Sequence, residues 1–183
     1  MDVHFSKEPN VNYMNAYYNV YSLFVNESLL GKFYYSSKKC SFSFDKISVR
    51  IDTTHRFFRK PKVVITDNIS NMVLGHYELT NWTIFNGYRH KLHLHDEIHS
   101  FKRHRPDGYS LFGKITWGRY KFTLTNNTEE ITYTFQIRYP LFSLGNIGPS
   151  LPFEGSIKFN SNNKMALFAG LYLIETALEN LSD

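Results

Sequence analysis

The sequence predicts a mainly β domain, a closed antiparallel β-barrel of about 10–12 strands around a central hydrophobic C-terminal helix. Three observations lead to this prediction. Aromatic residues make up 17% of the 183 residues, and large rings favour the half-buried surface of pleated strands. Apolar and polar residues alternate in many short segments, which is the period of a strand with one buried face. The longest apolar run without alternation lies near the C-terminus and has the length of a helix.

The clearest alternation covers residues 131–139. Isoleucine, tyrosine and phenylalanine side chains share one face there, while threonine, glutamine and arginine share the other. Residues 120–125 alternate in the same way, and the polar segment 126–129 between the two strands predicts a hairpin turn.

A second hairpin is predicted from residues 62–66, through a turn at 67–71, into residues 72–77. The turn contains Asp67 and Asn68, whose side chains bond the local backbone and tolerate left-handed conformations. The remaining predicted strands cover residues 17–25, 31–35, 40–45, 47–51, 82–85, 88–95, 109–117 and 155–159.

The helix is predicted over residues 163–181. Asn163 supplies a side chain that caps a helix start, and residues 165–174 contain no charged side chain. A helix that is apolar on every side must be buried on every side. Glu175 and Glu179 share one face a turn apart, so we expect the helix to leave the barrel there. Its length of about 28 Å matches the height of a small barrel.

Composition places the chain in one domain. Residues 1–15 are polar and are expected to form a flexible N-terminal arm, and residues 16–183 form a single barrel domain. Cys40 is the only cysteine, so it forms no internal disulfide and favours a reducing compartment. The start lacks a signal-peptide pattern, and no apolar run reaches the ~20 residues of a spanning helix. We therefore expect a cytoplasmic protein that is able to contact a membrane peripherally.

Three segments together resemble the tubby-like fold, which tubby C-terminal domains, phospholipid scramblases and LURP-one-related proteins share. They are the hairpin at residues 63–75, the segment 117–135, and residues 151–157 leading into the apolar 165–174. The resemblance covers residues 15–181 and implies a helix threaded through a barrel. It also implies membrane-lipid association, notably phosphoinositide binding through surface Lys and Arg in some members. A scramblase-like role is not expected, because the Cys-rich palmitoylated segment of that group is absent.

Two basic stretches are the candidate anion- or lipid-binding residues. In the first, Phe57 and Phe58 lie among cations, a combination that suits an anionic membrane surface. The same combination suits single-stranded nucleic acid, which we consider the less favoured partner, and two solvated loops with both rings in the core are the plain alternative. The candidate residues are Arg56, Arg59, Lys60, Lys62, Lys102, Arg103 and Arg105.

Most of the histidines lie between residues 76 and 104. Alternation would place His93 and His95 on one strand face, where two neutral imidazoles can chelate a transition metal. Asp96, Glu97 or His99 would have to complete the shell. The spacing matches no known zinc motif, and the surrounding Lys and Arg residues repel a cation. We therefore predict no metal site and interpret the segment as a polar, solvent-facing strand.

No motif for catalysis occurs. The sequence contains no Gly-X-Ser-X-Gly, phosphate loop or dinucleotide fingerprint, and alternation places Cys40 on the apolar face of its strand, as a core residue. We predict a non-enzymatic domain without a cofactor that binds anionic phospholipid head groups. The alternatives are a small-ligand or metal-binding β-barrel and a protein-interaction or structural domain.

Overall fold

The structure is a computed structural model that describes residues 2–13, 16–36, 39–56, 59–79, 89–104, 117–138, 154–160 and 163–179. The described chain contains twelve strands followed by one helix. In chain order these are β1 (Asp2–Tyr13), β2 (Ala16–Val25), β3 (Ser28–Tyr35), β4 (Cys40–Phe44), β5 (Ile47–Arg56), β6 (Arg59–Asp67), β7 (Val73–Glu78), β8 (Arg89–Leu94), β9 (Glu97–Arg103), β10 (Trp117–Thr125), β11 (Glu130–Arg138), β12 (Glu154–Phe159) and α1 (Lys164–Glu179).

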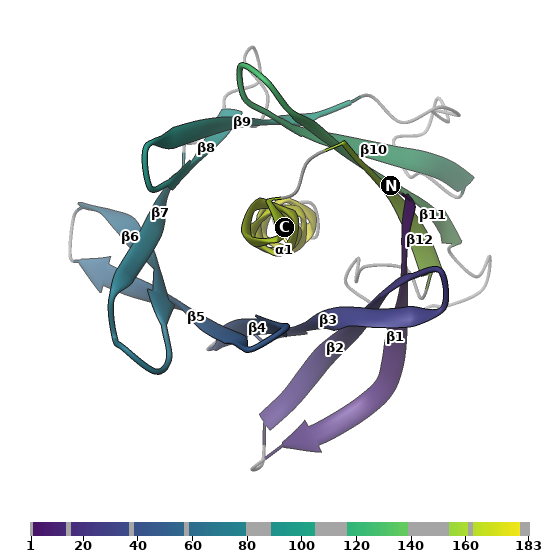
Figure 1. Ribbon diagram of the computed structural model, residues 1–183, viewed down its shortest axis with the longest axis horizontal. Coiled ribbons are helices and arrows are strands. Elements are labelled where there is room, and N and C mark those ends of the chain that lie inside the picture. Colours follow the sequence, from purple (N-terminus) through teal and green to yellow (C-terminus); the bar gives the residue numbers. More distant parts are fainter. Residues whose placement is uncertain are drawn as a thin grey trace.

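The strands form one closed barrel in which every strand pairs antiparallel with its neighbours in sequence. Strand β1 closes the ring by pairing with β12 on one side and β2 on the other. Viewed along the barrel, α1 lies in the middle of the ring (Figure 1). The predicted barrel of about 10–12 strands around a central C-terminal helix is therefore confirmed.

Aromatic side chains from the strands pack directly on the helix. The ring of Phe168 stacks on Phe42 and Phe44, with centroids 5.5 and 5.3 Å apart. On another side, the rings of Tyr172 and Tyr77 lie 4.8 Å apart. Residues 166–175 of α1 are all buried, because the barrel surrounds the helix instead of covering one face of it.

The helix approaches β11 closely at Gly170. The Tyr133 hydroxyl donates to the Leu167 carbonyl at 2.8 Å, and a Cβ at position 170 would overlap that same hydroxyl. Glycine, although a poor helix former, is therefore the residue that lets the Tyr133 ring reach the helix backbone.

The prediction for the N-terminus was wrong. Residues 2–13 do not form an arm but the strand β1, whose Val3 and Phe5 are buried in the core. Only Val3 and Phe5 alternate with polar residues at the start of this segment, and residues 6–10 after them are all polar or proline. The alternation is therefore too short to predict a strand. The barrel needs this strand, because without it β12 and β2 would present unpaired edges.

The predicted exit of the helix at Glu175 was also wrong. Glu175 is only 2% exposed, and Ala177, further along, is fully buried. Tyr21 of β2 lies beside it: burial, and then the Glu175 carboxylate, raise the pKa of the Tyr21 phenol. The barrel wall extends beyond the apolar run of the helix, so the carboxylate is enclosed inside the barrel beside the Tyr21 phenol.

Other differences concern single strands. The predicted strand 88–95 ends earlier, at Leu94, and the chain turns back at residues 95–96 into β9, a strand that was not predicted. The strand predicted at 82–85 lies outside the described residues. So does the strand predicted at 109–117, except Trp117, which begins β10. The two predicted hairpins, with turns at 67–71 and 126–129, are confirmed.

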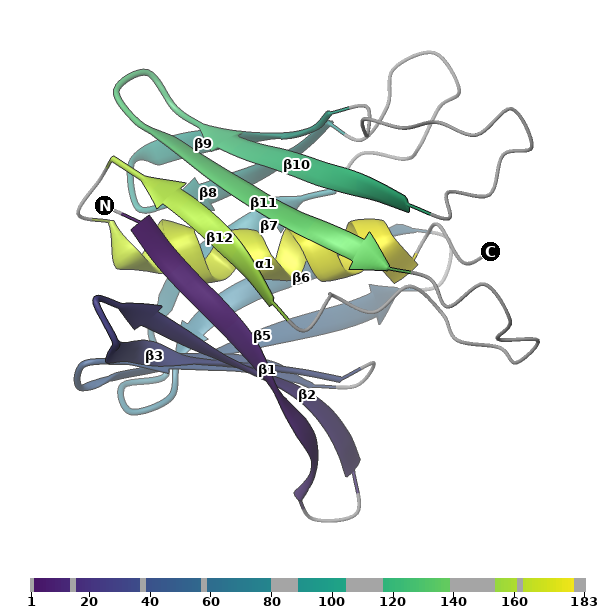
Figure 2. The same cartoon turned by 90° about the vertical axis from the view of Figure 1, so that its right-hand side faces the viewer.

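The two ends of the barrel are built differently (Figure 2). One end, here named the turn end, carries the hairpin turns at residues 26–27, 45–46, 68–72, 95–96 and 126–129, and α1 begins there. The Lys164 ammonium lies 2.7 Å from the Asp45 carboxylate of the turn end. At the opposite end α1 finishes, β5 meets β6, and β9 stops at Arg103. That opposite end is named the basic end, after Arg56, Arg59, Lys60, Lys62, Lys102 and Arg103.

Candidate anion-binding site at the basic end of the barrel

The first basic stretch lies where β5 and β6 meet. Arg56 and Arg59 are direct cross-strand partners there, and Lys60 and Lys62 follow along β6. Val63 and Ile65 face the core, so alternation directs Lys62 outward, and its side chain is exposed. Residues 57–58 lie outside the described residues. Lys62 therefore belongs to a strand of the barrel wall and not to a solvated loop.

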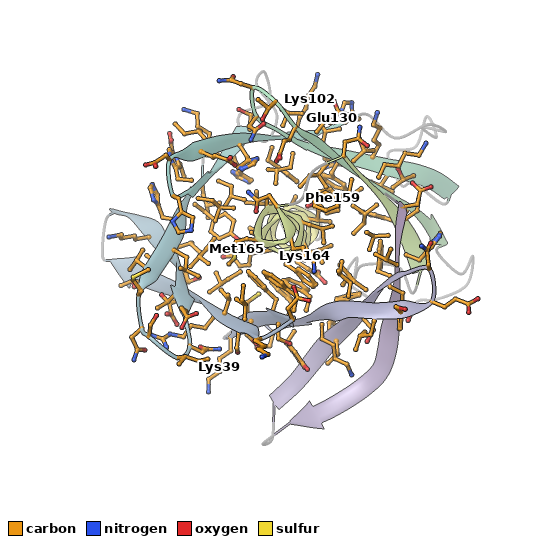
Figure 3. All side chains as sticks on the ribbon, in the orientation of Figure 1. Lys39, Lys102, Glu130, Phe159, Lys164 and Met165 are labelled. Atoms are coloured by element: carbon orange, nitrogen blue, oxygen red, sulfur yellow. The ribbon has the colours of Figure 1, made fainter. Side chains whose placement is uncertain are left out.

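The second stretch ends β9, and its two described cations point to opposite faces. Lys102 is exposed and projects outward from the ring (Figure 3). The guanidinium carbon of Arg103 lies 5.8 Å from the centre of the Tyr120 ring, which faces the interior. Neighbouring residues of a strand always differ in this way, so Arg103 covers the core beside Lys102 and cannot share its outer surface. Arg105 lies outside the described residues.

The structure brings both stretches to the same end of the molecule. Only β7 and β8 separate β6 from β9 around the ring. At roughly 4.8 Å per strand, Lys62 and Lys102 are about 15 Å apart across the wall. Lys91 of β8 lies in the gap and is exposed. The outer wall of the basic end therefore presents Lys62, Lys91 and Lys102 together.

Sequence reasoning missed Lys91 and the acid that accompanies it. Glu78 is the cross-strand partner of Lys91, and their charged groups lie 3.6 Å apart. The His93 hydrogen bond, then Lys91, hold the pKa of the Glu78 carboxyl below its usual range. Only the register of β7 against β8 reveals this pair, so no local pattern could have predicted it.

The histidines of this wall are paired differently from the prediction. His93 stacks on His76 of the neighbouring strand, with ring centroids 4.3 Å apart. His95 lies in the turn, at a φ of 49°, so it does not continue the face of His93 as predicted. His99 is buried opposite Leu92. Across the described ranges, no group of three or more His, Cys, Asp or Glu side chains could hold a metal ion.

Electrostatics make the lysines the main cations of this wall at neutral pH. Burial, followed by the charges of His93 and Lys62, lowers the pKa of His76. Burial, then Lys121 and Lys102, lowers the pKa of His104. Both imidazoles are therefore neutral near pH 7, and the positive charge that an anion would meet comes from lysine and arginine.

Cys40 is a core residue, as predicted. It is buried on the inner face of β4, and burial, with a contribution from Glu175, raises the pKa of the thiol well above its usual value. A protonated, buried thiol is neither a nucleophile nor a metal ligand.

The comparisons with known proteins give no match. No protein-family model fits this sequence, and neither the curated proteins nor the solved structures include a significant match. Within the described part of the chain, no helix combines the length and the hydropathy needed to cross a membrane.

Proposed function

We propose that this chain is a non-enzymatic binding module that contacts anionic phospholipid head groups at a membrane surface through its basic end. The observation that carries the proposal is the placement of both basic stretches at one end of the barrel, with Lys62, Lys91 and Lys102 exposed on its wall. Each basic residue near an anionic leaflet contributes about 1 kcal/mol of attraction.

The filled interior also favours binding at the surface. In the described part of the barrel, α1 and the side chains packed around it occupy the centre (Figure 3). A small ligand would have to displace a helix that is buried on all sides. The resemblance to the tubby-like fold points in the same direction, since some members of that group bind phosphoinositides through surface Lys and Arg.

The charge distribution would also orient the protein. The hairpins at the turn end carry Glu27, Asp45, Asp96 and Glu97, whereas the opposite end is basic. A charge separation along the barrel steers the basic end towards an anionic surface and the turn end away from it. Binding should therefore weaken as salt screens these charges.

The test is flotation with phosphatidylcholine vesicles, with and without phosphatidylserine, at low and at physiological salt. The Lys62→Glu plus Lys102→Glu variant should lose at least tenfold in binding to the anionic vesicles, because two attractive charges become repulsive. The matched control is Lys46→Glu plus Lys158→Glu, which changes the net charge equally at exposed positions away from the basic end.

Two outcomes would overturn the proposal. The wild-type protein could fail to float with anionic vesicles even at low salt, where electrostatic attraction is strongest. Alternatively, the control variant could lose as much binding as the Lys62 and Lys102 variant, which would mean that net charge and not the basic end determines binding.

A further inference from the structure

The large hydrophobic side chains that are exposed among the described residues all lie on the hairpins of the turn end. They are between 38% and 78% exposed. They are Leu29 on β2–β3, Ile47 on β4–β5, Ile69, Met72 and Val73 on β6–β7, and Ile98 on β8–β9. Clusters of exposed apolar side chains rimmed by polar ones mark contact surfaces more often than single ones do.

These four hairpins are neighbours around the ring, and hydrogen bonds near the turns tie three of them, β4–β5, β6–β7 and β8–β9, to one another. The backbone N–H of Asn68 donates to the Ser48 carbonyl at 2.9 Å, and the Asn68 amide donates to the Ser48 hydroxyl at 2.8 Å. The backbone N–H of His95 donates to the Leu74 carbonyl at 3.3 Å. The apolar residues of these three hairpins are therefore presented by one connected surface, and Leu29 lies on the hairpin beside it.

The most apolar of these turns is held in a fixed shape. The Asp67 carboxylate accepts from the backbone N–H groups of Ile69 and Ser70, each at 2.7 Å. Arg50 donates to the Asn71 amide oxygen at 2.9 Å. Ile69, 78% exposed at the tip, is thus displayed on a preorganised turn, and a rigid surface loses less entropy when a partner binds.

The charge around these apolar side chains is negative. The described hairpins of this end carry Glu27, Asp45, Asp67, Asp96, Glu97 and Glu129, against the basic residues Lys46, Arg50 beside Asn71 and, at the helix start, Lys164. We infer that the turn end is a docking surface for a protein segment that carries apolar and basic side chains together. Charge complementarity selects such a partner and rejects an acidic one, and the same carboxylates repel an anionic leaflet.

The placement allows two partners at once. The turn end and the basic end lie at opposite ends of α1 (Figure 2), so a protein segment on one leaves the other open. The inference stands on the turn end alone and holds whether or not the basic end binds lipid.

The experiment uses three fluorescent synthetic peptides of equal length, built from Lys and Leu, from Lys and Ser, and from Glu and Leu. Fluorescence anisotropy should show the Lys/Leu peptide binding the full chain at least tenfold more tightly than either of the others. The Ile69→Ser plus Met72→Ser variant should lose this preference. Both positions are exposed, so the variant should fold normally, which its thermal unfolding checks.

The control separates this inference from the proposed function. The Lys62→Glu plus Lys102→Glu variant should bind the Lys/Leu peptide at least as tightly as the wild type while losing anionic vesicles. The Ile69→Ser plus Met72→Ser variant should keep anionic vesicles while losing the peptide. If one variant lost both ligands, the two surfaces would not be independent and the inference would be overturned.

Three further results would overturn it. One is equal binding of all three peptides. Another is concentration-dependent self-association in analytical ultracentrifugation that Ile69→Ser plus Met72→Ser abolishes, which would assign the surface to a second copy. The third is flotation with pure phosphatidylcholine vesicles that the same variant abolishes, which would assign it to a neutral membrane.

Discussion

At the turn end, α1 is tied to the barrel by polar contacts near the surface, whereas towards the basic end its polar groups are buried. Lys164 pairs with Asp45 at 2.7 Å, and the Asn163 side chain donates to Glu97 at 3.2 Å. Further along, the Tyr77 hydroxyl donates to the Ala169 carbonyl inside the core, and Glu175 is only 2% exposed. Contacts at the surface are screened by water and salt, whereas buried ones are screened much less, so the two ends should respond differently to mutation and pH.

The charges that suit the helix dipole lie on the barrel and not on the helix. The first turn of α1 contains no acidic residue and its last turn no basic one, although carboxylates favour a helix start and cations a helix end. Asp45 and Glu97 of the turn end contact the side chains of Lys164 and Asn163 at the start. These barrel carboxylates therefore supply, at the start of the helix, the negative charge that its own first turn lacks.

The largest effect should come from a change in the interior that both ends share, because unfolding the core destroys the two ends together. Leu171 is 1% exposed in the middle of α1, and Leu171→Asp would bury an unpaired charge. The cost is several kcal/mol, comparable to the whole stability of a domain. Thermal unfolding followed by circular dichroism should show no cooperative transition. Asn160→Asp, at an exposed position, is the control. A variant as stable as the wild type would mean that the helix is not central to the fold.

A smaller effect is expected where the helix meets Tyr133. Gly170→Ala should destabilise the protein by about 1–3 kcal/mol, because overpacking a full site outweighs the better helix propensity of alanine. Tyr133→Phe removes the hydroxyl that the new methyl group would overlap. Urea unfolding should therefore show the double variant to be more stable than the sum of the single changes predicts. Strict additivity would contradict the close approach.

Local patterns predicted much of this fold. Alternation at residues 131–139 and the polar turns at 67–71 and 126–129 depend on neighbours in sequence, and the hairpins they predict are present. The apolar stretch 165–174 likewise predicted an enclosed helix. Strand β1 was missed because Val3 and Phe5 are its only apolar residues near the start, and its pairing with β12 joins opposite ends of the chain.

The placement of the candidate site residues depends on strand register and on whether the number of strands between them is odd or even. Hairpins alternate between the two ends of an antiparallel barrel, so the stretch that begins β6 and the stretch that ends β9 reach the same end only because an even number of strands separates them. Because β9 was not predicted from the sequence, this number of strands could not be established. The pairs His76–His93 and Glu78–Lys91 likewise follow from the register of β7 against β8. Their members lie too far apart in sequence for a local pattern to connect them.

Acid should weaken the basic end through His90. His90 lies on β8 and faces the interior of the barrel, where its ring stacks on Phe101. Burial lowers its pKa to about 4 from an ordinary value of 6.5. Above pH 6.5 both the folded and the unfolded chain hold it neutral. As the pH falls from 6.5 to 4, only the unfolded chain gains the proton, so stability is lost, by about 1–3 kcal/mol.

The measurement is the free energy of unfolding in urea between pH 7 and pH 4, for the wild type and for His90→Gln. Carboxylates contribute to the pH dependence of both proteins, so the informative quantity is the difference between them. The wild type should lose more stability than the variant over this interval. Parallel curves would show that His90 titrates equally in the folded and unfolded states.

The smallest effect is expected for the ion pair that ties the helix start to the turn end. Lys164 and Asp45 lie 2.7 Å apart, with their side chains one-third and 60% exposed, and exposed pairs of this kind contribute about 0.2–1 kcal/mol. A double-mutant cycle with Lys164→Met and Asp45→Asn should give a coupling of that size at low salt. The coupling should be smaller at about 0.5 M salt, where the Debye screening length is ~4–5 Å. A salt-insensitive coupling above about 2 kcal/mol would contradict the comparison, because the turn end would then hold the helix as firmly as the buried contacts do.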